Sequence, residues 1–187
     1  MMDMGPYYLT ALVNLAGPIT RVTGMVNKAF GTRTMTSSER NGDTVDVEIM
    51  THVTGSIEFA DGAVGTIVTS FDIWKSDVPR IEVHGTKGSL SIPDPNTFGN
   101  DTNDLLLCRE GTEEWEINPL DGFSYADNSR GLGVVDMALA IGQERPHRAS
   151  GELAGNVLEA MLGFELSAQS GSYAELSGGL KERPAAM

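Results

Sequence analysis

The sequence is poor in cysteine and in basic residues, and it has no long apolar run. Cys108 is its one cysteine, so no disulfide can form within the chain. Its 13 basic residues stand against 26 acidic ones, a net charge of -13, which argues against nucleic acid, whose phosphates need a basic surface. No apolar run approaches the roughly 18 to 20 residues of a membrane-spanning helix. We do not expect "MMDMGPYY" to be a signal peptide, because it has no cationic stretch leading into an apolar core. We expect a soluble, cytoplasmic protein with neither a nucleic-acid nor a membrane partner.

The length of 187 residues favours a single domain over residues 1–187, since domains of this size are ordinary. A folded chain of this length buries roughly 70% of the surface that its unfolded form exposes. It can therefore be stable without a disulfide or a structural metal, and no repeat or linker in the sequence divides it.

Apolar residues recur at helical spacing in three segments. The first runs from Met4 to Ala16 and ends at Gly17 and Pro18, with Asp3 placed to cap its start. The other two are "GLGVVDMALAIGQ" and "GELAGNVLEAMLGFELSAQSG", at residues 131–143 and 151–171.

Between the first and second helices, β-branched and aromatic residues are separated by short turn signals, a pattern typical of strands. A helix, a block of strands and two further helices predict an α+β fold: an open-faced, predominantly antiparallel β-sheet with helices packed on one face. The expected strands cover residues 21–30, 44–53, 54–59, 63–74, 80–85, 88–92, 104–108 and 114–118.

Two hairpins are expected. "FADGAV" turns at Asp61 and Gly62, residue types that accept the positive φ of a tight turn. "VHGTKGSL" turns between Gly85 and Gly88. If the first loop has two residues, the facing pairs are Phe59 with Val64, Ile57 with Thr66 and Gly55 with Val68. The opposite, Thr-rich face of this hairpin would then have no chain segment to cover it, which predicts pairing of subunits through the sheet.

Asp3 and Tyr7 are the first candidates for chemistry. They stand four residues apart, so on a helix the carboxylate and the phenol would share one face and could reach the same ligand. The structural alternative is an N-cap at Asp3 and a partly buried anchor at Tyr7. A phenol titrates near pH 10, so Tyr7 would be a poor base at neutral pH unless a cation lay nearby.

Few other residues are candidates for a binding or catalytic role. No histidine or cysteine spacing suggests a metal site, and the G-x-G at Gly131 follows no strand and lacks the third glycine of a dinucleotide fingerprint. The cluster "RPHRASGE" either complements the carbonyl end of the preceding helix or contacts an anionic ligand or a partner domain. Arg80, His147 and Arg148 are the candidate substrate-binding residues.

Five segments together resemble the C-terminal domain of the Gfo/Idh/MocA oxidoreductases, the family of glucose-fructose oxidoreductase and inositol dehydrogenase. They occur in the family's order and cover nearly the whole chain. The segments are "DMGPYYLTALVNLAGPITRVTG", "TGSIEFADGAVGTIVTSFDIW", "PRIEVHGTKGSLSIPDPNTFG", "GVVDMALAIGQERPHRASGELAGNVLEAM" and "ELSAQSG".

The resemblance implies a role for the chain start. In this family the first helix of the domain usually carries D-x-G-x-H, whose Asp and His act in proton transfer beside a lysine of an N-terminal Rossmann domain. Asp3 and Gly5 match this motif, and Tyr7 stands in place of the histidine. Asp3 and Tyr7 are thus the expected catalytic residues, with Tyr7 donating a hydrogen bond to a sugar oxygen or relaying a proton.

The resemblance also implies NAD or NADP for the full-length enzyme, but this sequence has no G-x-G-x-x-G unit and no E-K-P lysine motif. We therefore expect no cofactor to bind to this chain alone. One hypothesis is the substrate-binding and oligomerisation half of a sugar or polyol dehydrogenase whose Rossmann domain is missing or separate. Without that domain, the first and last helices should expose apolar surface. The alternative is a stand-alone, non-catalytic binding or assembly module.

Overall fold

The computed structural model describes residues 1–98, 104–119 and 129–185. It divides into two compact units: unit 1 is Met1–Lys75 with Gly151–Met187, and unit 2 is Ser76–Ser150. The two units have separate sheets. That one domain spans residues 1–187 stays a prediction.

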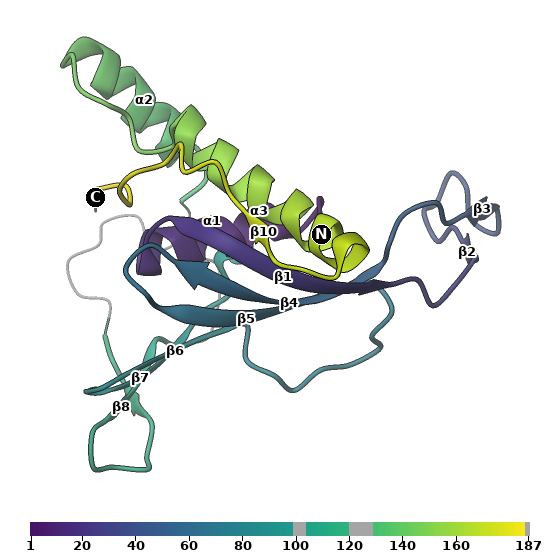
Figure 1. The fold of residues 1–187 in the computed structure, drawn as a ribbon, viewed down its shortest axis with the longest axis horizontal. Coiled ribbons are helices and arrows are strands. Elements are labelled where there is room, and N and C mark those ends of the chain that lie inside the picture. Colours follow the sequence, from purple (N-terminus) through teal and green to yellow (C-terminus); the bar gives the residue numbers. More distant parts are fainter. Residues whose placement is uncertain (99–103, 120–128, 186–187) are drawn as a thin grey trace. The chain divides into compact units, whose positions relative to one another are not determined.

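Unit 1 is a four-stranded antiparallel sheet with two helices on one side (Figure 1). Its elements are α1 (Gly5–Ala16), β1 (Ile19–Asn27), β2 (Thr32–Thr34), β3 (Thr44–Asp46), β4 (His52–Phe59), β5 (Val64–Ser70), α3 (Gly151–Ser170) and β10 (Ala174–Glu175). The strand order is β10, β1, β4, β5, and α1 and α3 share one core with this sheet. The short β2–β3 hairpin interrupts the chain between β1 and β4.

Helix α1 ends where the sequence predicts. Gly17 takes φ 91° and its N–H donates to the carbonyl of Val13, which is how glycine commonly terminates a helix. The prediction that Asp3 caps the start is wrong, because the N-cap is Met4 and no side chain caps the helix. A turn before the helix replaces the cap: the N–H of Gly5 donates to the carbonyl of Met1 at 2.7 Å.

Helix α3 lies directly against the sheet because glycines leave room for it. A Cβ added to Gly24 would lie 2.4 Å from the carbonyl oxygen of Phe164, and one added to Gly55 would lie 2.6 Å from the Phe164 ring. The fully buried Phe164 therefore fills the space that side chains on β1 and β4 would otherwise take. The largest other fully buried side chains are Leu9, Val13, Ile19, Val22 and Ile57.

A buried amide also joins α3 to β1. Asn156 is only 3% exposed, and its Oδ1 accepts from the N–H of Ile19 at 3.0 Å while its Nδ2 donates to the carbonyl of Ile19 at 2.8 Å. Both backbone groups of Ile19 are thus paired by one side chain, as buried polar groups require.

The β4–β5 hairpin turns with three residues, not two. The N–H of Phe59 donates to the carbonyl of Ala63, and Gly62 takes φ 90°, the arrangement of a three-residue loop with a left-handed third residue. The predicted pairs Phe59–Val64, Ile57–Thr66 and Gly55–Val68 are therefore wrong. Glu58 faces Val64, Ser56 faces Thr66 and Thr54 faces Val68.

This register changes the character of the open face of the unit 1 sheet, the side away from α1 and α3. Val64 and Val68 join the hydroxyl-bearing side chains there and are 79% and 60% exposed. Met25 of β1 lies beside Thr54 in the same row and is exposed as well. The open face is thus partly apolar.

Unit 2 consists of a second antiparallel sheet and one longer helix. Its elements are β6 (Ile81–Gly85), β7 (Gly88–Ile92), the 3-10 helix η1 (Pro95–Thr97), β8 (Leu106–Arg109), β9 (Glu116–Ile117) and α2 (Leu132–Gly142). The strands follow in sequence order, and the turn predicted between Gly85 and Gly88 is confirmed by their pairing. Among the residues that the structure describes, antiparallel strands and three α-helices confirm the α+β fold class.

Candidate functional site

Asp3 and Tyr7 lie at the start of α1 in unit 1. Asp3 is exposed in the turn before the helix, and Tyr7 lies partly exposed in the first helical turn. Gly5, between them, is buried: a Cβ there would lie 2.7 Å from Sδ of Met1 and 3.1 Å from Sδ of Met161. The glycine lets the start of α1 approach Met161 of α3, while Asp3 remains at the surface.

Arg80 precedes β6 in unit 2 and is exposed. Its Nε lies 3.6 Å from Oδ2 of Asp94, an ion pair that contributes little to stability when its cation is exposed.

Arg148 is bound to a buried acid of α2. Asp136 is 5% exposed and accepts from the backbone N–H of Arg148 at 2.8 Å, from Nη2 of Arg145 at 2.8 Å and from Nη1 of Arg148. The backbone donor first, and then the Arg145 guanidinium, lower the pKa of Asp136 to about 2. The acid is ionised at neutral pH and holds the turn after α2 closed against the helix.

The buried and paired position of Asp136 was not predicted from the sequence. Its signal was a single acid inside the apolar stretch "VVDMALA", nine and twelve residues before two arginines. Such an acid is seldom buried unless it is paired.

His147 is half-buried between these arginines. Its Nδ1 is buried and has no hydrogen-bond partner among the residues that the structure describes. Because buried polar atoms are nearly always paired, this nitrogen marks a place where a water or a ligand atom would be favourable.

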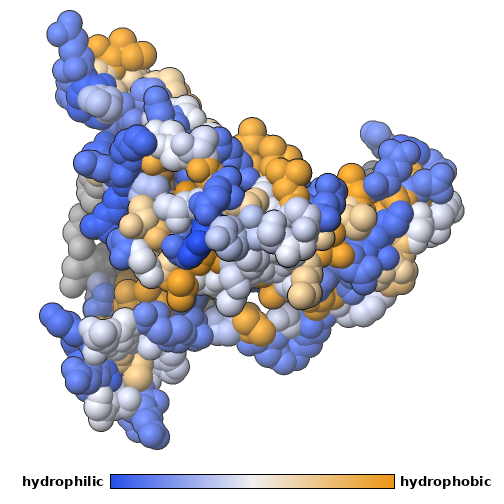
Figure 2. All heavy atoms as spheres, viewed as in Figure 1, coloured by the Kyte–Doolittle hydropathy of each residue, from blue (hydrophilic) through white to orange (hydrophobic). Residues whose placement is uncertain are grey.

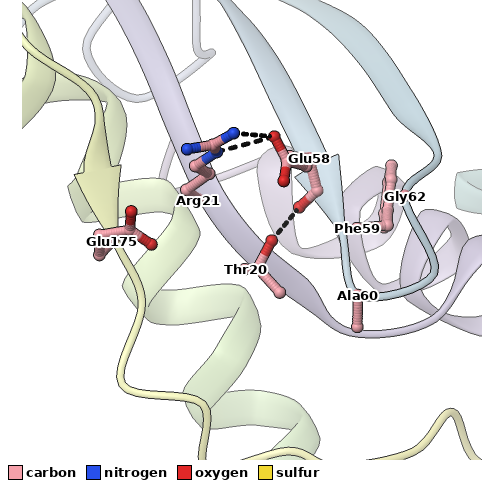
Figure 3. A pocket seen from close by; sticks show the side chains of 7 residues that line it. All are labelled: Thr20, Arg21, Glu58, Phe59, Ala60, Gly62 and Glu175. Carbon is pink, nitrogen blue, oxygen red and sulfur yellow. Dashed lines mark hydrogen bonds and ion pairs between the residues drawn. The ribbon is translucent and has the colours of Figure 1, made fainter.

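A pocket of about 300 Å³ opens on unit 1 beside the β4–β5 turn (Figure 3). Nε of Arg21 donates to Oε2 of Glu58 at 2.7 Å, and the guanidinium lies 4.7 Å from the centre of the Tyr173 ring. The hydrogen bond to Glu58 raises the pKa of Arg21 above its ordinary value. The pocket is lined by Thr20, Arg21, Glu58, Phe59, Ala60, Gly62 and Glu175.

Two carboxylates and a hydroxyl beside one guanidinium suit a neutral, hydroxyl-bearing ligand better than an anion. This pocket could not be predicted from the sequence, because most of its residues come from β1, β4 and β10, which only the sheet register brings together.

A second group of residues that was not predicted from the sequence surrounds Asp72, which follows β5. Its carboxylate accepts from Oγ1 of Thr51 at 2.6 Å, from Nη2 of Arg33 at 2.6 Å and from the N–H of Ala29 at 3.3 Å. The hydrogen bond from Thr51 is the main reason that the pKa of Asp72 is lowered. Ala29 precedes the β2–β3 hairpin, Arg33 lies within β2 and Thr51 follows the hairpin, so Asp72 ties the hairpin to the end of β5.

The described residues do not fit a nucleotide. Every strand pair among them is antiparallel, whereas dinucleotide sites are built on parallel strands with a glycine-rich turn. Within the same residues, no three His, Cys, Asp or Glu side chains are grouped to hold a metal ion. None of the described helices is both long and apolar enough to cross a membrane.

The first part of the chain matches a known protein family. Residues 1–91 match the model of the GFO/IDH/MocA C-terminal domain. No curated protein matches the sequence. The match confirms the family resemblance over these residues, which make up just under half of the chain.

Solved structures share the fold over nearly the whole chain. An NAD binding oxidoreductase from Klebsiella pneumoniae is 20% identical with a TM-score of 0.68, over 93% of this chain and 50% of its own. Levoglucosan dehydrogenase in its apo form is 17% identical with a TM-score of 0.69, over 93% and 50%. Its complex with NADH and L-sorbose has a TM-score of 0.68 at 17% identity, over 95% and 50%. The chain thus spans about half the length of the structures it matches.

Proposed function

We propose that this chain is the substrate-binding and oligomerisation domain of an NAD(P)-dependent oxidoreductase that acts on a sugar, polyol or related hydroxy compound. The main support is the D-x-G-x-Y start of α1, which leaves Asp3 exposed and Tyr7 partly exposed in a domain of this family. Further support is levoglucosan dehydrogenase, which shares the fold and has been solved with NADH and L-sorbose. NAD or NADP would be held by a Rossmann domain, since the described residues do not fit it.

Asp3 and Tyr7 are the proposed catalytic residues. The Asp3 carboxylate would accept a hydrogen bond from a substrate hydroxyl, and the Tyr7 phenol would donate one to a neighbouring oxygen. Through this hydrogen bond, Tyr7 would orient the substrate.

Arg80, His147 and Arg148 are the proposed substrate contacts of unit 2. The unpartnered Nδ1 of His147 supports its inclusion. The guanidinium of Arg148 shares its charge with Asp136, so we expect it to position the His147 loop as well as to contact a ligand.

The open face of the unit 1 sheet is the proposed contact between copies of the chain. We expect light scattering to detect a dimer or larger oligomer. Val68→Lys should shift the protein toward the monomer because it puts a charge into the apolar part of that face. Val78→Lys is the control, since Val78 is also well exposed but lies in unit 2. A wild-type protein that stays monomeric at high concentration would count against this contact.

Sugar binding tests the roles of Asp3 and Tyr7. We expect Tyr7→Phe and Asp3→Asn each to weaken the binding of L-sorbose or levoglucosan by about three- to tenfold, the usual effect of losing one hydrogen bond. Ligand-observed NMR on the purified chain measures this, with Glu48→Gln as a control on another exposed acid. Sugar binding that neither variant changes would favour the stand-alone module instead.

A further inference from the structure

The start of α1 packs on two methionine side chains. Gly5, Leu9 and Val13 are the buried residues of α1, and they recur at intervals of four, so they form its inner side. Gly5 has a helical backbone, so its conformation does not require glycine. An added Cβ would lie 2.7 Å from Sδ of Met1 and 3.1 Å from Sδ of Met161, closer than such atoms normally approach. Glycine is therefore needed at position 5 for space.

The core of unit 1 supports both sulfurs. Figure 2 shows apolar side chains of α3 at the surface, but Met161 is not one of them, since it is 8% exposed and belongs to the core. Met1 packs against the same core, and its Sδ lies 4.0 Å from Oγ1 of Thr69 in β5. The two methionines therefore set how closely the first turn of α1 approaches α3 and the sheet.

The candidate catalytic residues Asp3 and Tyr7 lie two residues before and two residues after this contact. The N–H of Gly5 donates to the carbonyl of Met1 at 2.7 Å and closes the turn that contains Asp3. The N–H of Tyr7 donates to the carbonyl of Met4 at 3.2 Å. A shift of Gly5 away from the methionines therefore moves both side chains, and a displacement of about 1 Å is enough to misalign a catalytic or binding group.

We propose that Gly5 and Met161 are positioning residues for Asp3 and Tyr7. The missing side chain at position 5 lets the first turn of α1 lie against Met161, and this contact fixes where the carboxylate and the phenol stand on the domain. The proposal rests on the proposed function in one respect, namely that Asp3 and Tyr7 bind the sugar. It adds a residue of α3 to the D-x-G-x-Y motif.

Gly5→Ala tests the positioning. The nearest atoms that the new Cβ meets belong to two flexible side chains, so we expect the melting temperature to stay within about 4 °C of the wild type. Binding of L-sorbose or levoglucosan, measured by ligand-observed NMR, should weaken at least about threefold. The control is Gly155→Ala within α3, where an added Cβ would meet no described atom within 4 Å. It should leave sugar binding unchanged.

A second readout needs no sugar. The NMR signal of the Tyr7 ring, assigned with Tyr7→Phe, should shift in Gly5→Ala and stay in place in Gly155→Ala. Met161→Val removes one of the two sulfurs beneath Gly5 and gives the end of the Met1 side chain room to move aside. Combined with Gly5→Ala, it should bring the Tyr7 signal and the sugar affinity back toward those of the wild type, because neighbouring substitutions are coupled.

Two results would overturn the proposal. One is a Tyr7 signal in Gly5→Ala that equals that of the wild type. The other is a loss of folding in Gly5→Ala that Met161→Val does not reverse, which would make Gly5 a residue of stability alone. Failure of the proposed function looks different: sugar binding would be absent, or Asp3→Asn and Tyr7→Phe would leave it unchanged, whereas the Tyr7 signal would still shift in Gly5→Ala and return in the double variant.

Discussion

Gly55→Ala is expected to destabilise unit 1 by about 3 kcal/mol or more, the upper end of the usual range for overpacking. A Cβ at Gly55 would lie 2.2 Å from the carbonyl oxygen of Thr23 and 2.6 Å from the Phe164 ring. Neither neighbour can move freely, because Thr23 is part of β1 and Phe164 is fully buried. Strand β4 would have to separate from β1 or from α3.

Urea unfolding followed by circular dichroism measures this effect. Gly65→Ala in the adjacent strand β5 is the matched control, because a Cβ there would meet only the Phe59 ring, at an ordinary 3.6 Å. We expect the control to change the free energy of unfolding by less than about 1 kcal/mol. Equal stabilities of the two variants would show that α3 does not approach β4 as closely as described.

Asn156→Leu is expected to cost about 2 to 5 kcal/mol. The substitution keeps a side chain of similar size but removes both hydrogen bonds to Ile19, leaving a buried N–H and a buried carbonyl unpaired at about 1 to 3 kcal/mol each. The same unfolding measurement applies. Since native domains are stable by only about 5 to 15 kcal/mol, this loss is a large fraction of the total.

Asn14→Ala provides the comparison for Asn156. Asn14 is exposed, and its Nδ2 donates to the carbonyl of Thr10 within α1, where water can replace the bond. We expect a change of no more than about 0.5 kcal/mol. If Asn156→Leu were as mild as Asn14→Ala, the buried link between α3 and β1 would not be a main support of unit 1.

Local chemistry made part of the fold predictable from the sequence. The end of α1 follows from Gly17 and Pro18, because one residue takes a positive φ and the other has no N–H to continue the helix. The β6–β7 turn follows in the same way from Gly85 and Gly88.

The β4–β5 register could not be predicted because it depends on the number of turn residues. One additional residue in the turn exchanges the faces of an entire strand, and the sequence "FADGAV" allows two or three. The structure selects three, through the hydrogen bond from Phe59 to Ala63. The consequence is the exposure of Val64 and Val68 on the open face.

The candidate site was predictable only where its residues are close in sequence. Asp3, Gly5 and Tyr7 form one short motif that family resemblance can identify. The pocket lined by Arg21 and Glu58 depends on a hydrogen bond between residues 37 positions apart, which the strand register brings together. The hydrogen bonds that Asp136 accepts join residues up to 12 positions apart, which the turn after α2 brings together. Spacing along the chain carries little information about such contacts.

The most direct test of the proposed function is to titrate the purified chain with a sugar and, separately, with a nicotinamide nucleotide. We expect saturable binding of L-sorbose or levoglucosan in the millimolar range, and no NADH binding detectable by fluorescence. Micromolar NADH binding to this polypeptide by itself would contradict the proposal, because a nucleotide site would then lie among residues that we assign to the substrate and to subunit contacts.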